Sequence, residues 1–335
     1  MKEKIKVIQM GLGTIGKSAT KFLLEKKGLE IVGALDMDKE KVGKDLGEVA
    51  GIGRRLGVIV TDDADSLFSE TCAHVVIHAV CSYLHEAYPQ IKKPIEEGMN
   101  IISSCEQLSN PYAINPGLAS KLDKLAKKHG VTVLGSGFNP GFGMDYLVLA
   151  FTAVCGKVHK IKAHRSVDLS SGWKVGEGLG LVHAGVGKTA EEFKKGVEEG
   201  VIREHSFIEQ FREISDRLGW KLTDIRTRLE PLMGENGRAI GVRTFSEGIE
   251  NGELRIEMVH EQFVAPERET ADRLVIEGVP NINMVISPAI VAPESTVNVM
   301  INVIPHVINA KPGIMTPVDL PLIFALEDDV RLFIK

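Results

Sequence analysis

The first 36 residues carry the pattern that most constrains the fold. Residues 5–10 are a short apolar run, IKVIQM, and a G-x-G-x-x-G motif follows it at Gly11, Gly13 and Gly16. Helical spacing of apolar residues covers 14–27, and a second apolar run ends at Asp36, 20 residues beyond the last glycine. Glycine turns occur in many strand–helix connections, but this complete order is typical of a βαβ unit that binds a dinucleotide.

Each part of this pattern has a physical role in dinucleotide binding. Gly11 permits a tight turn, Gly13 lets the backbone approach the pyrophosphate, and Gly16 lets helix and strand pack closely. The free N–H groups and the positive dipole end of the helix attract phosphate. Asp36 would accept hydrogen bonds from the ribose hydroxyls and repel a 2′-phosphate, and the following Met37-Asp38 supplies no arginine. We therefore expect NAD as the cofactor, with NADP as the alternative.

Composition excludes several classes of protein. The 335 residues suffice for two domains, and 44% hydrophobic with 25% charged residues is typical of a soluble globular chain. The net charge of -5 and the lack of a basic run argue against a nucleic-acid partner. No apolar stretch approaches the length of a membrane span and no signal peptide is evident, so we expect a cytoplasmic protein with no membrane partner. The four cysteines show no C-x-x-C spacing, and we expect no metal site.

The remaining pattern predicts two domains. Strand-like and helical segments alternate after Asp36, which indicates a Rossmann-type, doubly wound parallel sheet in the α/β class. The expected segments are strands at 57–60, 73–80, 100–104 and 131–134, and helices at 82–97 and 116–129.

Beyond residue 156 the pattern changes to longer strands, which indicates a second, α+β domain. The expected segments are strands at 157–168, 223–232, 239–248 and 253–264, helices at 189–199 and 205–218, an Asn-Gly hairpin at 250–253, and a helix at 295–309. We assign 1–140 to the dinucleotide-binding domain, with 294–335 returning to it. Residues 141–293 are assigned to an α+β substrate-binding and dimerisation domain.

Loops at the carboxyl edge of the first sheet carry the candidate chemistry. Glu106, in SSCEQLSNP, could orient an amine and move its proton; the alternative is a solvated loop acid or a helix cap. Asn139, in a glycine-rich turn, could contact the nicotinamide, or the glycines serve only the turn. His78 lies inside an apolar strand, which favours a hydrogen-bonded core histidine. The full set of expected cofactor contacts is Gly11, Leu12, Gly13, Thr14, Ile15, Gly16, Asp36, Met37, Ala79, Val80, Ser82, Cys105 and Asn139.

The second domain offers groups for a substrate carboxylate. Strand alternation places Arg165 on one face, where a buried guanidinium could bind a carboxylate bidentately. His205 and His260 are candidate partners of the same carboxylate. Lys188, in GVGKT, lacks the upstream glycine of a P-loop, so no nucleoside triphosphate site is expected there.

Several segments, taken together, resemble one family over nearly the whole chain. In chain order they are GLGTIG, VIHAVCSYL, SSCEQLSNP, GFNPGFGMD, TAEEF, LEP and VNVMINVIPHVINAKPGIMTPVDLP. The chain resembles the 2,4-diaminopentanoate dehydrogenases and the related native amine dehydrogenases, whose N-terminal half is similar to dihydrodipicolinate reductase.

The resemblance implies NAD(P)-dependent oxidative deamination of a short amine, reversible as reductive amination. For the diaminopentanoate enzymes, the C4 amine is oxidised to give 2-amino-4-oxopentanoate and ammonia. Glu106 matches the active-site glutamate of the family. Arg165, His205 and His260 fall near positions that line the polar end of the substrate pocket. Related enzymes associate through their second-domain sheets, which implies a homodimer.

Two departures from the family pattern concern the substrate wall. Residues 166–173, SVDLSSGW, lack an arginine pair, and 176–187 are rich in glycine. Both bear on substrate identity more than on reaction type. Two alternatives remain open. One is a dihydrodipicolinate-type C=N reductase, although residues 164–172 of this chain only faintly resemble the lysine-containing motif of those enzymes. The other is a non-catalytic NAD-binding module.

Overall fold

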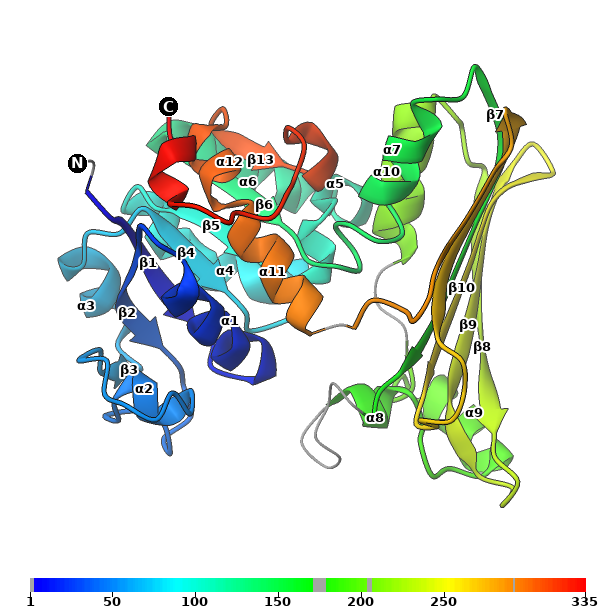
Figure 1. Cartoon of the computed structure of the whole chain (residues 1–335), viewed down its shortest axis with the longest axis horizontal. Coiled ribbons are helices and arrows are strands. Elements are labelled where there is room, and N and C mark those ends of the chain that lie inside the picture. Colours follow the sequence, from blue (N-terminus) through cyan, green and yellow to red (C-terminus); the bar gives the residue numbers. More distant parts are fainter. Residues whose placement is uncertain (1–2, 171–178, 204–206, 292) are drawn as a thin grey trace. The chain divides into compact units, whose positions relative to one another are not determined.

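The computed structural model describes residues 3–170, 179–203, 207–291 and 293–335. The chain forms two compact units (Figure 1). The first contains Met1–Phe142 and Pro293–Lys335, and the second contains Gly143–Ala292.

The first unit is built on a seven-stranded parallel sheet in the order β13-β6-β5-β4-β1-β2-β3. Its strands are β1 (Ile5–Met10), β2 (Leu29–Leu35), β3 (Val60–Thr61), β4 (Val75–His78), β5 (Asn100–Ser103), β6 (Thr132–Gly135) and β13 (Gly313–Met315). The chain runs outward from β1 through β2 and β3, then continues on the other side of β1 with β4. This reversal is the topological switch point at which such sheets bind ligands. The Rossmann-type sheet that the sequence predicts is confirmed.

The helices of the first unit begin and end largely where local signals place them. They are α1 (Thr14–Glu25), α2 (Leu46–Val49), α3 (Ala64–Glu70), α4 (Leu84–Glu96), α5 (Pro111–Ile114), α6 (Pro116–His129), α11 (Glu294–Asn302) and α12 (Ile304–Asn309). The clearest case is α6, which matches the predicted range. The side chain of Asn115 caps its start, Pro116 is its first residue, and Gly130 ends it with a φ of 72°.

The predicted helix at 295–309 is instead two helices. The break falls at Val303, between α11 and α12, and Pro305 lies in the first turn of the second helix. Because proline has no N–H to donate, a single continuous helix would lose a hydrogen bond there. The segment that follows forms β13 beside β6. The predicted strand at 57–60 is also shorter than expected, since only Val60–Thr61 pairs with β2.

The second unit contains a six-stranded mixed sheet in the order β12-β11-β7-β10-β9-β8. Its strands are β7 (Lys157–Asp168), β8 (Asp224–Met233), β9 (Ala239–Glu250), β10 (Glu253–Phe263), β11 (Ala271–Val279) and β12 (Ile282–Ile286). The predicted hairpin between β9 and β10 is confirmed, because Asn251 and Gly252 both have positive φ angles, 51° and 86°. The strands β11 and β12 were not expected.

Helices cover one face of this second sheet (Figure 1). They are α7 (Tyr146–Thr152), α8 (Leu179–His183), α9 (Ala190–Glu198) and α10 (Phe207–Leu218). The apolar stripe of α10 carries Phe211 and Ile214, which pack with Ile161 of β7 and Met258 of β10. Burial of this stripe holds the helix on the sheet.

The opposite face of the second sheet contains a buried carboxylate among cations. The side chain of Glu261 is only 4% exposed. Its oxygens lie 3.5 Å from His164 Nε2, 2.5 Å from Arg243 and 3.1 Å from Arg268 Nη2. The hydrogen bond with His164 and the two guanidinium groups lower the pKa of Glu261 to about 2.

The Glu261→Gln variant should be less stable than the wild type at neutral pH, by about 2 kcal/mol, because two guanidinium groups lose their counter-ion. A lowered carboxyl pKa stabilises the fold above the ordinary value of 4.5, and this stability is lost as the pH falls toward 2. The difference in thermal midpoint should therefore be constant above about pH 5 and shrink below it.

The matched control is Glu257→Gln, since Glu257 is 36% exposed and lies 3.7 Å from Lys160. That change should cost less than about 1 kcal/mol at any pH. Equal effects of the two substitutions, or a Glu261 effect independent of pH, would contradict the stabilising role given to the Glu261 carboxylate.

Candidate functional site

Two glycines let three segments meet at the carboxyl end of β1. A Cβ atom on Gly11 would lie 2.4 Å from the carbonyl oxygen of Ala79, and Gly11 has a φ of 85°. A Cβ atom on Gly16 would lie 1.8 Å from the carbonyl oxygen of Gly11. Both positions therefore exclude any side chain, as the motif requires of its first and third glycines.

Gly13 differs from the other two glycines, because a Cβ atom there would meet nothing within 4 Å. It precedes α1, and its helix start has no side-chain cap. The N–H groups of the first helical turn thus face a place where a group can approach the backbone closely. These features fit a dinucleotide pyrophosphate.

The side chain of Gln9 holds the glycine loop by hydrogen bonds, a role that the sequence analysis did not predict. It is fully buried in β1, and its Nε2 atom donates to the carbonyl oxygens of Gly11 at 3.0 Å and Ile77 at 3.3 Å. A polar residue inside an otherwise apolar strand was the available signal.

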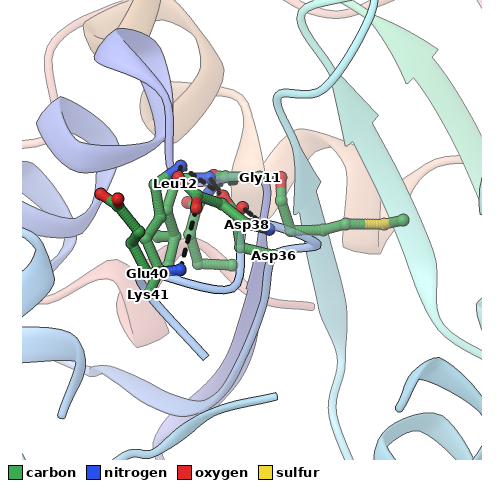
Figure 2. A network of polar contacts seen from close by, with 8 residues as sticks. Gly11, Leu12, Asp36, Asp38, Glu40 and Lys41 are labelled. Carbon is green, nitrogen blue, oxygen red and sulfur yellow. Dashed lines mark hydrogen bonds and ion pairs between the residues drawn. The ribbon is translucent and has the colours of Figure 1, made fainter. Parts of the chain in front are cut away.

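Asp36 connects the end of β2 to the glycine loop (Figure 2). Its Oδ2 atom accepts from Leu12 N–H at 2.7 Å and from Lys41 Nζ at 3.1 Å, while Oδ1 accepts from Asp38 N–H at 2.9 Å. Lys41 Nζ also lies 3.3 Å from Asp38 Oδ2. Sequence reasoning missed Lys41, since nothing in its spacing indicates that it folds back onto Asp36.

Hydrogen bonds join the loops that follow β4 and β5. Ser104 N–H donates to the carbonyl of His78 at 2.9 Å, and Gln107 N–H donates to that of Ser82 at 3.3 Å. Glu106 lies between them, as the first residue of a short 3₁₀ helix, η1 (Glu106–Leu108).

A third strand end supports the loop that carries Glu106. A Cβ atom on Gly135, the last residue of β6, would lie 2.1 Å from the carbonyl carbon of Leu108, so the loop passes directly over β6. Glu106 is half-buried, and its Oε2 atom is shielded from solvent. The carboxylate is therefore held at the edge of the sheet where ligands bind.

His78 is a hydrogen-bonded core residue, as expected. It is fully buried, its Nδ1 atom lies 2.7 Å from Ser103 Oγ, and its Nε2 atom lies 3.0 Å from Gln90 Oε1. Ser103 Oγ also accepts from Cys105 N–H at 3.0 Å. The histidine thus ties β4, β5 and α4 together beneath the two loops.

The loop after β6 packs against the start of α11. Asn139 is half-buried within it, and the neighbouring Phe138 N–H donates to Thr296 Oγ1 at 3.2 Å. Ser136 is 4% exposed, and its hydroxyl has no hydrogen-bond partner in the part of the chain that the structure describes. Its position at the same sheet edge makes it a further polar candidate that sequence reasoning missed.

The other predicted cofactor contacts differ in exposure. Thr14, Met37 and Val80 are exposed; Ile15, Ala79 and Ser82 are half-buried; Leu12 and Cys105 are buried. Each belongs to the glycine motif or to a loop at the carboxyl edge of the first sheet.

In the second unit, Arg165 binds a carboxylate of the chain itself. Its side chain is 2% exposed, Nη1 donates to Asp272 Oδ1 at 2.5 Å, and Nη2 donates to the carbonyl of Ile290 at 2.5 Å. Burial lowers the pKa of Arg165, and the ion pair with Asp272 opposes that shift. His260 is its neighbour across β7 and β10, and the rings of His260 and Phe207 are nearly perpendicular at a centroid distance of 6.5 Å. The predicted third member, His205, lies outside the described residues.

The described residues contain neither a cluster suited to a metal ion nor a helix suited to span a membrane. No cluster of three or more His, Cys, Asp or Glu side chains there could hold a metal ion. None of the described helices has the length and apolarity to cross a bilayer.

The contrast between the glycines predicts different effects of alanine. Gly16→Ala should lower the thermal midpoint by roughly 5–10 °C, since its methyl group must displace backbone. Gly13→Ala should lower it by less than about 3 °C, because that methyl group has open space and the φ of -74° suits alanine. Calorimetry of both variants checks this, and equal midpoints would contradict the packing described.

Comparison with known proteins places the chain in a family. Residues 142–335 match the model of the 2,4-diaminopentanoate dehydrogenase C-terminal domain, and residues 5–102 match that of the dihydrodipicolinate reductase N-terminus. The chain is 40% identical to 2,4-diaminopentanoate dehydrogenase of Acetoanaerobium sticklandii, over 98% of this chain and 97% of that protein.

Solved structures agree with this placement. An amine dehydrogenase from Mycobacterium smegmatis superposes with a TM-score of 0.84 at 27% identity, over 97% of this chain and 98% of that one. A myo-inositol dehydrogenase from Lactobacillus casei, in complex with NAD(H) and myo-inositol, shares the fold with a TM-score of 0.53 at 15% identity, over 87% of this chain and 76% of that one. The ranges matched by the two family models include the glycine loop, Asp36 and the second-unit sheet. The chain therefore belongs to the 2,4-diaminopentanoate dehydrogenase family of oxidoreductases, with a nucleotide-binding N-terminal fold.

Proposed function

We propose that this protein catalyses the NAD-dependent oxidative deamination of 2,4-diaminopentanoate to 2-amino-4-oxopentanoate and ammonia. The observation that carries this proposal is the position of Glu106, on a loop hydrogen-bonded to the loop after β4 at the edge that also carries the glycine motif. The relative from Acetoanaerobium sticklandii bears the name of this activity.

The residues of the first unit fit the parts of a dinucleotide. The glycine loop and the start of α1 would hold the pyrophosphate, and Asp36 would hold the adenosine ribose through the remaining acceptor capacity of Oδ1. The loops after β4, β5 and β6 would contact the nicotinamide half. When bound, the nicotinamide accepts hydride from the carbon that bears the amine.

Glu106 would handle the protons of the reaction. A carboxylate beside the nicotinamide can accept a proton from the substrate ammonium, which leaves the amine lone pair free to assist departure of the hydride. Oxidation produces an iminium, and water must then add to that carbon. Once the carboxylic acid has released its first proton to solvent, the carboxylate can accept the proton of this water and pass it to the nitrogen, so that ammonia leaves and a ketone remains.

Glu106→Gln should reduce kcat for 2,4-diaminopentanoate by roughly 10²–10⁴, the range for loss of a general base. The dissociation constant for NAD, measured by fluorescence titration, should change less than about threefold, since the substitution preserves shape. The control is Glu96→Gln, a surface carboxylate 3.7 Å from Lys92 in α4, which should retain full activity.

Retained activity in Glu106→Gln would contradict the assignment of this residue. Turnover of dihydrodipicolinate without turnover of any amine would instead support the C=N reductase. NAD binding with no turnover in a panel of short amines and diamines would support a binding module.

We propose NAD rather than NADP as the preferred cofactor. Two carboxylates, Asp36 and Asp38, lie at the end of β2 and would repel a 2′-phosphate, but Lys41 Nζ lies within 3.3 Å of both. Lys41 therefore offsets part of this repulsion and is the group that could bind the extra phosphate. Preference for NAD should thus be set by Asp36 and moderated by Lys41.

Asp36→Asn should raise the ratio of kcat/KM for NADP to that for NAD by tenfold or more, which corresponds to about 1.4 kcal/mol. Lys41→Met should lower the same ratio, because two carboxylates then face the phosphate without a cation. Lys44→Met, on the exposed side of the same turn, should leave the ratio unchanged. If Lys41→Met leaves the ratio of kcat/KM for NADP to that for NAD unchanged, the role given to Lys41 is contradicted.

We propose that the protein forms a homodimer through the face of the second sheet opposite α10. This face carries both signs of charge, with Lys162 2.7 Å from Glu277, and Arg228 stacked 4.1 Å over the ring of Phe245. A face with both signs of charge and aromatic rings offers opposite charges and apolar area to a second copy across a two-fold axis. Sedimentation velocity should give a dimer for the wild type and a monomer for Phe245→Asp, and a monomeric wild type would contradict the proposal.

A further inference from the structure

Two cysteines face each other at the edge of the first sheet, and the proposed reaction uses neither. Cys81 follows β4 and Cys105 follows β5. Cys81 and Cys105 lie close enough for each thiol to shift the pKa of the other, and Cys81 packs against the hydrophobic cluster that contains Cys105. All four cysteines of the chain are free thiols, and Cys72 is exposed.

The backbone on either side holds these two cysteines together. The Ser104-to-His78 hydrogen bond lies before the pair, and the Gln107-to-Ser82 hydrogen bond lies after it. The Gln107 side chain adds a third connection, since its Oε1 atom accepts from Leu84 N–H at 2.9 Å. The two loops therefore cannot separate without breaking these three hydrogen bonds.

The two thiols have different environments. Cys81 is half-buried, and Gln90 Nε2 donates to its Sγ atom at 3.9 Å. Because Gln90 Oε1 faces His78 Nε2 at 3.0 Å, the amide is oriented with its N–H group toward the sulfur. The hydrogen bond from Cys105, with further support from His78, lowers the pKa of Cys81 to about 5.

Cys105 has the opposite character. It is 1% exposed, and burial together with the neighbouring Cys81 raises its pKa above the ordinary value. One sulfur is therefore suited to be an accessible thiolate that reacts with an oxidant, and the other to be a protected thiol that acts second.

We propose that Cys81 and Cys105 form a peroxide-reactive dithiol, which closes to a disulfide between the loop after β4 and the loop that carries Glu106. The Cys81 thiolate attacks hydrogen peroxide, an S–O bond forms, the O–O bond breaks, and the departing hydroxide takes a proton to become water. The Cys105 sulfur then attacks the sulfenic sulfur, the S–S bond forms, the S–O bond breaks, and the thiol proton leaves with the oxygen as water. Each sulfur is oxidised by one electron, and the peroxide is reduced to two water molecules.

The experiment uses the full chain with Cys72→Ser and Cys155→Ser as background, so that only the two cysteines of interest remain. After treatment with stoichiometric hydrogen peroxide and alkylation, trypsin separates the Cys81 and Cys105 peptides by cleaving at Lys92. Mass spectrometry without reduction should find these peptides linked, and dithiothreitol should release them. Absence of the linked species after peroxide treatment would overturn the proposal.

Single variants then distinguish the two roles. With Cys105→Ser added, Cys81 should remain as a sulfenic acid that dimedone labels. With Cys81→Ser added, Cys105 should stay unlabelled, because it is buried. Labelling of Cys105 and not of Cys81 would overturn the assigned order, and circular dichroism of each variant verifies folding. These measurements follow sulfur chemistry alone, so their outcome does not depend on which amine the enzyme oxidises.

Discussion

The structure of the first unit depends on a close approach of backbone segments that is possible only where the residue is glycine and carries no side chain. Gly16 lies against the carbonyl oxygen of Gly11, and Gly11 in turn lies against that of Ala79, at distances where a Cβ atom would overlap backbone. This contact brings β1, α1 and the loop after β4 to one point. The buried amide of Gln9 and the carboxylate of Asp36 then fasten the glycine loop from two sides. These contacts hold the backbone around Gly13 in place, and the space beside Gly13 therefore stays open.

The same sheet edge carries both the carboxylate proposed to handle protons and the proposed dithiol. Parallel pairing of β4 with β5 aligns the ends of both strands, so the loops that follow them must run side by side. His78 and Ser103 form a buried hydrogen bond at the ends of these strands. Glu106, Cys81 and Cys105 lie on the loops that follow.

Local sequence signals predicted much of the fold and less of the site. The α6 helix has a capping asparagine, an N-terminal proline and a C-terminal glycine, and its predicted range agrees with the structure. The predicted helix at 295–309 was wrong because that range contains Pro305, which lies in the first turn of a second helix. The partners of Arg165 could not be predicted, since Asp272 lies 107 residues away on a strand that was not expected. Lys41 was missed for a related reason: its contact with Asp36 depends on how a turn folds back.

The sequence by itself determined the Rossmann-type sheet, the three glycines and the acid at the end of β2, because strand periodicity and motif spacing are local properties of the chain. Only the tertiary structure decided which groups those residues meet. It paired Asp36 with Lys41, Arg165 with Asp272 and Cys81 with Cys105. Such pairs depend on the order of the strands in a sheet and on how the loops close over its edge. Each pair stabilises the fold only when both partners are present, and the partners are separated in the sequence, so local signals do not predict it.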